Sequence, residues 1–175
     1  MLTAKTAAAS VNAAQPSEQP TDTETYSKGI LGPVSFKLSK LTIAGSNADP
    51  ADPVQSGYIV ASNEKFTVSV DIEFNSSPLS KLLMCLGTTI SVDFGFEGYG
   101  AAADEVDIKA SIVTKKDEFT YTISTTMTPD EAKLTAGLYQ IGATVTVGPG
   151  NNPCAQYVFG YGYIDGLRFQ VYPVM

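Results

Sequence analysis

The sequence predicts an all-β protein built as an antiparallel β-sandwich, and three observations lead to this fold class. Segments of alternating apolar and polar residues recur along the chain, which is the pattern of half-buried strands. Gly, Pro, Asp and Asn separate these segments about every ten residues, as in sandwich domains. Only one segment longer than a single turn has the composition of a helix. The 175 residues are enough for one domain with a core and too few for two comfortable ones.

The alternating segments predict eight or nine strands. They are 34–43, 58–60, 66–74, 88–96, 106–113, 118–126, 138–147, 157–163 and 167–172. The alternation in the first segment slips by one residue at Ser39 and Lys40, which indicates a β-bulge. Asp165 and Gly166 lie between the last two segments, and this dipeptide is typical of a hairpin turn.

The one helical candidate is 78–86, which we expect to cross between the sheets. Ser77 is a suitable N-cap, Pro78 fits the first turn, and Gly87 follows the end of the segment. A second segment, 128–133, predicts a single helical turn or a plain turn before the strand that begins near residue 138.

The segment 134–147 carries a resemblance to a known class of domain. Gly137 and Tyr139 lead into strict alternation as far as Val147, and residues 30–174 are similar to immunoglobulin-like β-sandwiches of bacterial and viral surface proteins. The resemblance implies that the Tyr139 hydroxyl bonds to nearby backbone before this strand, as a tyrosine corner. The sequence departs from the pattern because it lacks Trp and has Thr135 where an acidic residue is usual. A jelly roll would show nearly the same alternation.

Residues 1–29 predict an extended or disordered N-terminal arm that precedes a sandwich domain at 30–175. They contain almost no large apolar side chains besides Leu2, Val11 and Tyr26. Such a segment cannot bury enough apolar surface to offset the entropy of ordering it. We therefore expect it to become ordered mainly when a neighbouring subunit holds it.

Charge and composition disfavour several classes of partner. The net charge is −7 and the 11 Lys and Arg residues are scattered, whereas nucleic acid and anionic membranes need clustered cations. No apolar run approaches the 18 residues of a membrane span, and the N-terminus lacks the apolar stretch of a signal peptide. The low share of charged residues favours an extracellular or cell-surface protein.

The two cysteines allow either a disulfide or two separate thiols. Cys85 lies in an apolar context that predicts burial, and Cys154 lies in a turn after the 138–147 strand. The spacing suits an inter-sheet bridge, but these contexts favour independent thiols.

Acidic residues suggest two kinds of ionic site. Asn47, Asp49 and Asp52 share one loop, and Asp104, Glu105 and Asp107 share another. Calcium prefers such oxygen ligands, so Asp49, Asp52, Asp104 and Asp107 are candidate ligands, with ordinary turn chemistry as the alternative. Asp71, Glu73, Asp93 and Glu97 lie on the polar faces of two strands, and they would form one acidic patch if those strands shared a sheet.

The aromatic run Tyr157, Phe159, Tyr161 and Tyr163 allows two interpretations. The rings either fill the inner face of the last hairpin, which we favour, or form a flat surface that binds a sugar or a partner. Gly160 and Gly162 would then lie on the opposite face.

We therefore expect a non-enzymatic structural subunit that self-assembles, as in a surface filament or coat, through its arm and sheet edges. The alternative is a sandwich module that binds carbohydrate or protein. A catalytic role is disfavoured because the chain contains no histidine, the usual general base and metal ligand. No cofactor is expected apart from calcium.

Overall fold

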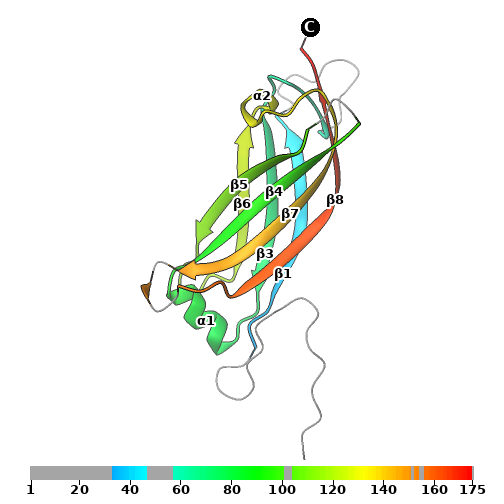
Figure 1. Ribbon diagram of the computed structural model, residues 1–175. Coiled ribbons are helices and arrows are strands. Elements are labelled where there is room, and N and C mark those ends of the chain that lie inside the picture. The colour runs from blue at the N-terminus through cyan, green and yellow to red at the C-terminus, as the bar shows by residue number, and fades with distance from the viewer. Residues whose placement is uncertain (1–32, 47–56, 101–103, 151, 154–155, 175) are drawn as a thin grey trace, which may run out of the picture.

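The computed structural model describes residues 33–46, 57–100, 104–150, 152–153 and 156–174. These residues form two sheets that face each other and whose strands cross obliquely (Figure 1). The smaller sheet contains, in spatial order, β1 (Phe36–Gly45), β3 (Phe66–Phe74) and β6 (Thr120–Met127). The larger sheet contains β2 (Ile59–Ala61), β8 (Gly160–Tyr172), β7 (Gly137–Gly150), β4 (Thr88–Tyr99) and β5 (Val106–Val113). The predicted all-β, two-sheet fold is confirmed.

Strand direction and order define the arrangement further. Neighbouring strands are antiparallel, except that β2 runs parallel to β8. The adjacent strands β8, β7 and β4 follow the order of strands G, F and C in an immunoglobulin sandwich. The strand of the resemblance, β7, is thus a central strand of the larger sheet.

Two short helices connect the sheets, and both begin at the caps that the sequence provides. Helix α1 (Pro78–Cys85) carries the chain from β3 in one sheet to β4 in the other, as predicted. The Ser77 side chain accepts a hydrogen bond from the Ser80 amide at 3.1 Å. Helix α2 (Pro129–Ala132) is capped by Thr128 and connects β6 to β7.

The core lies between the sheets and is centred on an aromatic cluster. Phe66 of β3 meets Phe169 of β8 and Phe96 of β4, at ring-centroid distances of 5.2 and 6.0 Å. Phe96 also contacts Phe169 and Tyr139, at 6.1 and 6.4 Å. All four rings are almost fully buried, so the cluster joins the two sheets across the sandwich.

The prediction of a hairpin turn at Asp165–Gly166 is wrong. Residues 160–172 form one strand that pairs with β7 on both sides of these residues. The register shifts opposite Ile141 and Gly142, so the extra residue is accommodated as a bulge, and Gly166 adopts φ +104° there. The long partner β7 offers hydrogen bonds along this whole length, which favours one continuous strand.

The bulge predicted in β1 is present, whereas the predicted burial of Cys85 is wrong. The register of β1 against β3 shifts between Ser39 and Thr42, and Lys40 adopts φ +50°. Cys85 is exposed at the end of α1 because the buried face of that helix is formed by Ser80, Leu83 and Met84. Cys154 lies outside the described residues.

Candidate functional site

Tyr139 occupies a structural position at the start of β7. It is fully buried, and its hydroxyl donates a hydrogen bond to the Thr135 carbonyl oxygen at 2.7 Å. The Thr135 hydroxyl lies 3.2 Å from the Tyr139 hydroxyl oxygen. This geometry fixes the chain where it enters β7, which is the structural role that the resemblance implies for Tyr139.

The aromatic run divides between core and surface. Phe159 packs partly against the core, whereas Tyr157, Tyr161 and Tyr163 are 74%, 53% and 65% exposed. The favoured interpretation, that these rings fill the inner face, is therefore wrong for the three tyrosines. The glycines lie on the inner face instead: Gly160 is buried, and a Cβ atom on Gly162 would lie 2.6 Å from the Phe36 ring of β1.

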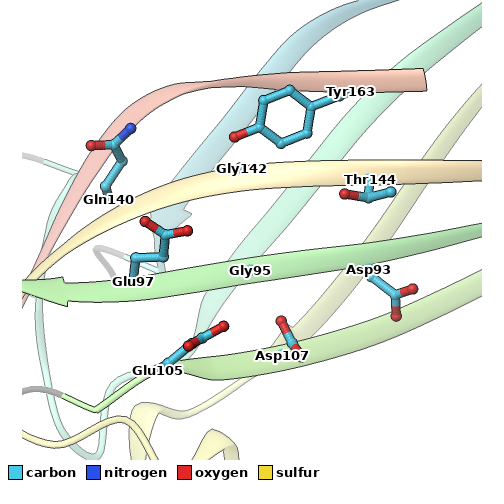
Figure 2. Close-up of a pocket in the computed structure, with 9 residues that line it drawn as sticks. All are labelled: Asp93, Gly95, Glu97, Glu105, Asp107, Gln140, Gly142, Thr144 and Tyr163. Carbon is cyan, nitrogen blue, oxygen red and sulfur yellow. The ribbon is translucent and has the colours of Figure 1, made fainter.

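A shallow groove crosses the outer face of the larger sheet beside Tyr163 (Figure 2). Its floor is made by Gly95 of β4 and Gly142 of β7, which lie opposite each other in the register. The walls carry seven side chains: Asp93, Glu97, Glu105, Asp107, Gln140, Thr144 and Tyr163. The groove exists because two adjacent positions on this face lack side chains.

The tyrosine of the groove lies over one of these glycines. The Tyr163 hydroxyl would be 3.1 Å from a Cβ atom on Gly142, and it lies 3.2 Å from Asp165 Oδ2. Partial desolvation, and then the charge and hydrogen bond of Asp165, raise the pKa of Tyr163. The groove is thus acidic and presents one neutral, exposed aromatic ring.

The acidic residues are distributed differently from the predicted single patch. Strands β3 and β4 belong to opposite sheets, so Asp71 and Glu73 lie on one outer face and Asp93 and Glu97 on the other. The neighbours of Asp93 and Glu97 instead come from β5 on one side and from β7 on the other. Asp93 also forms an ion pair with Lys109 at 3.4 Å.

Two of the four predicted calcium ligands, Asp104 and Asp107, lie among the described residues. Asp107 lines the groove, and Asp104 is exposed before β5. Asp49 and Asp52 lie outside the described residues, as do the arm residues Leu2, Val11 and Tyr26. Within the described part of the chain, no three acidic or cysteine side chains are arranged to hold a metal ion.

A second candidate surface is the edge of the smaller sheet formed by β6. This strand has eight residues without a charge, a proline or a bulge, and its register with β3 is regular throughout. The other edge strands carry features that discourage pairing: β1 is bulged and bears Lys37 and Lys40, β2 has three residues, and β5 carries Asp107 and Lys109. Among the described strands, β6 is therefore the unprotected edge.

The direction of the β6 backbone groups follows from one hydrogen bond. The Phe74 amide donates to the Phe119 carbonyl oxygen at 2.8 Å. Antiparallel pairing alternates, so the odd-numbered residues of β6 direct their N–H and C=O groups toward β3. The even-numbered residues direct theirs to the open edge: Thr120, Thr122, Ser124 and Thr126.

The side chains of this edge are fixed by the neighbouring strand. Thr122 donates a hydrogen bond to Asp71 Oδ1 at 2.6 Å. This bond lowers the pKa of Asp71 most, and the hydrogen bond and charge of Lys40 lower it further. The Thr126 and Thr67 hydroxyls lie 2.7 Å apart. These contacts reduce the side-chain freedom that a binding partner would otherwise have to restrict.

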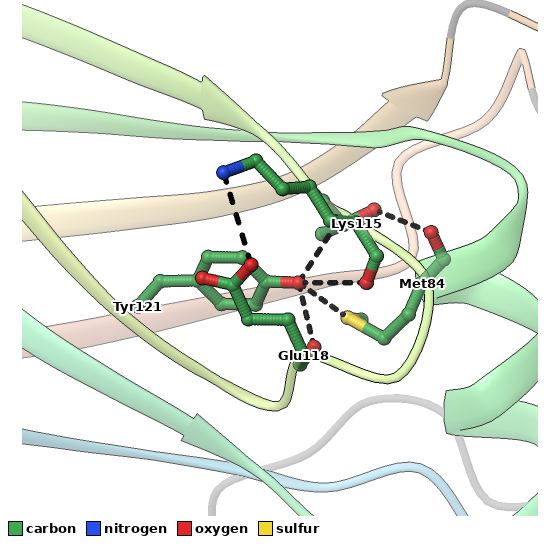
Figure 3. A network of polar contacts seen from close by, with 5 residues as sticks. Met84, Lys115, Glu118 and Tyr121 are labelled. Atoms are coloured by element: carbon green, nitrogen blue, oxygen red, sulfur yellow. Dashed lines mark hydrogen bonds and ion pairs between the residues drawn. The ribbon is translucent and has the colours of Figure 1, made fainter.

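The start of β6 is fixed by a buried tyrosine whose contacts the sequence did not reveal (Figure 3). The Tyr121 hydroxyl donates to the Glu118 carbonyl oxygen at 2.6 Å and accepts from the Lys115 amide at 3.1 Å. Met84 Sδ lies 3.3 Å away. Burial raises the pKa of Tyr121. The alternation in 118–126 indicates only that this ring is inside.

Replacing Tyr121 by phenylalanine should lower the free energy of unfolding by about 1–3 kcal/mol. The change keeps the ring but removes the hydroxyl that the Lys115 amide and the Glu118 carbonyl share. Urea denaturation measures the difference. Tyr157→Phe, at an exposed ring, is the control and should stay within about 0.5 kcal/mol of the wild type. Equal stability of both variants would show that the Tyr121 hydroxyl contributes nothing.

Comparisons with known proteins show similarity at the level of backbone arrangement. No protein-family model matches the sequence, and no curated protein matches it. A β-glucosidase from Listeria innocua matches 79% of this chain with 10% identity and a TM-score of 0.39, but the match spans only 16% of that enzyme. The major subunit of aggregative adherence fimbriae type I from Escherichia coli matches 83% of this chain and 98% of its own, with 9% identity and a TM-score of 0.36. None of the helices in the described residues has the length and apolar character to cross a membrane.

Proposed function

We propose that this protein is a non-enzymatic structural subunit that self-associates through a sheet edge, as in a surface filament or coat. The observation that supports the proposal most directly is the β6 edge, which is uncharged, unbulged and unpaired among the described residues. Soluble proteins usually protect such edges, because an open edge offers hydrogen bonds to another strand. The other three sheet edges of this sandwich are protected, so the open edge of β6 is best explained by a role in binding.

The N-terminal arm is the second element of this proposal. Residues 1–29 are poor in apolar side chains, and a neighbouring subunit would supply the surface that orders them. Main-chain pairing of an arm with a sheet edge makes few demands on sequence, which suits this composition.

Light scattering of residues 1–175 and 30–175, from about 1 µM to 1 mM, tests self-association. We expect oligomers of the full chain that increase with concentration and with salt, because each subunit carries a net charge of −7 and salt screens the repulsion. Loss of oligomers in 30–175 would assign the contact to the arm. Parallel samples with calcium and with chelator test the predicted calcium role. Monomers under every condition would contradict the proposal.

A second function is supported by the groove on the outer face of the larger sheet. A glycine floor, one exposed tyrosine ring and several carboxylate and amide groups suit a sugar, whose ring stacks on tyrosine while its hydroxyls donate to carboxylates. We therefore propose carbohydrate as the ligand class of this groove.

A glycan array followed by titration calorimetry tests the sugar-binding function. We expect Tyr163→Ala to weaken binding roughly tenfold, since stacking on an aromatic ring contributes on the order of 1 kcal/mol or more. Tyr157→Ala is the matched control, because Tyr157 is also exposed but does not line the groove. An array without any bound glycan, or equal affinity of both variants, would exclude the groove as a sugar site.

A further inference from the structure

We infer that the β6 edge pairs antiparallel with β6 of a second copy of this chain across a two-fold axis. The inference rests on the proposed self-association and names its partner. It would join the two smaller sheets into one continuous sheet across the dimer. The argument uses three properties of the strand: the direction of its backbone groups, its lack of charge, and the rigidity of its two ends.

Backbone direction determines which registers are allowed. Only even-numbered residues of β6 direct hydrogen-bonding groups to the open edge, and the same residues have exposed or outward-facing side chains. Two antiparallel copies therefore satisfy each other when even-numbered residues lie opposite even-numbered residues. A pairing of Thr122 with Ser124 of the second copy meets this condition and keeps the polar faces of both sheets on the same side.

The absence of charge selects a second copy as the partner. Each chain has a net charge of −7, so two copies repel unless they meet where carboxylates are not brought together. The eight residues of β6 contain none, and hydroxyl side chains cover the outward positions. Hydroxyl pairs across strands are mildly favourable, whereas like charges directly opposite are destabilising. A two-fold arrangement of β5 would instead bring charged residues together.

Both ends of β6 are fixed before any partner arrives. The Tyr121 hydroxyl ties the turn before the strand to Lys115 and Glu118. After the strand, Thr128 and Glu131 form a reciprocal capping box, with hydrogen bonds of 2.8 and 3.1 Å. A rigid strand loses little conformational entropy on pairing, which favours this edge over an unstructured segment as a binding surface.

The test compares Ser124→Lys with Ser69→Lys by analytical ultracentrifugation of the full chain. Ser69 lies directly opposite Ser124 on the adjacent strand β3 and on the same face, so both variants add the same charge to the same sheet. We expect Ser124→Lys to weaken dimerisation roughly tenfold or more, because the lysine lies on the open edge. Ser69→Lys should dimerise like the wild type. Ser124→Pro, which removes an amide that faces the open edge and not one that pairs with β3, should act like Ser124→Lys.

Residue-resolved hydrogen exchange supplies the second readout. At high concentration, exchange at Thr120, Thr122, Ser124 and Thr126 should slow roughly tenfold, while Tyr121 and Ile123, already paired with β3, should change little. Oligomers that form equally well in Ser124→Lys, with rapid exchange at these four amides, would overturn the β6 pairing and leave self-association standing. Slow exchange at these amides that is lost in residues 30–175 would show that the β6 edge pairs with an N-terminal arm instead. A chain that is monomeric throughout would overturn both proposals.

Discussion

Replacing Phe96 by alanine should lower the free energy of unfolding by about 3–5 kcal/mol, the usual cost of removing a buried phenylalanine. Phe96 is fully buried and contacts Phe66, Tyr139 and Phe169. One of these rings belongs to the opposite sheet, so the change opens a cavity at the contact between the sheets. The surrounding β-strands are held by their ladders and cannot close this space. Thermal or chemical denaturation measures the loss.

Two further variants separate the cavity from other effects of the substitution. Phe96→Leu keeps most of the apolar volume and should cost clearly less than alanine. Tyr99→Ala, on the same strand but half exposed, should cost little, because its hydroxyl bond to Gln140 is on the surface. If Phe96→Ala were no more destabilising than Tyr99→Ala, the aromatic cluster would not be the main contact between the sheets.

The strands were predictable because burial on one face imposes a period of two on the sequence. The alternation in 66–74 and 106–113 places β3 and β5 at their observed bounds. The cap of α1 was predictable for a similar reason, since the Ser77 side chain accepts from the Ser80 amide within one turn. Features that depend on neighbouring residues alone can thus be deduced from one sequence.

Features that depend on strand order could not be deduced. Asp165 and Gly166 fit either a turn or a bulge, and the long partner β7 decides for the bulge. The tyrosines of β8 point outward because Phe36 of β1 occupies the space above Gly162. Alternation alone separates the tyrosines of this segment from its glycines. It does not say which of these two faces packs against the other sheet.

The groove and the open edge of β6 could not be predicted from the sequence for the same reason. The groove combines residues of β4, β5, β7 and β8, and only the observed order of these strands brings them together. The open edge of β6 follows from its position at the border of the smaller sheet. The one signal in the sequence was the lack of charge between Thr120 and Met127.

The two borders of the smaller sheet differ in what they can do. At one border, β1 packs beside β8 of the other sheet, and its bulge and lysines discourage pairing. At the other border, β6 presents regular backbone groups. Because β6 packs beside β5 of the larger sheet, association through β6 would leave the opposite border, between β1 and β8, exposed.

Replacing Gly162 by alanine should destabilise the fold by about 1–3 kcal/mol, through overpacking at the β1–β8 border. A Cβ atom there would lie 2.6 Å from a Phe36 ring atom and 2.9 Å from Leu38 Cδ1. The Leu38 methyl group can move, but the Phe36 ring packs against Phe74 at a centroid distance of 5.6 Å. Gly95→Ala is the matched control, because its Cβ atom would meet only Asp107 Oδ1 at an ordinary 3.5 Å. We expect that variant to be neutral or slightly stabilising, since glycine is unfavourable inside a strand.

A double-mutant cycle with Phe36→Ala identifies the cause of the Gly162 effect. If steric conflict with the ring is responsible, the Gly162→Ala change should cost little once the ring has been removed, giving a coupling energy of about 1 kcal/mol or more. Additive costs would show instead that the alanine disturbs the β8 backbone itself. Because the conflict lies at the border away from β6, the folded Gly162→Ala protein should still associate like the wild type. A loss of association in that variant would place the contact between copies at the β1–β8 border.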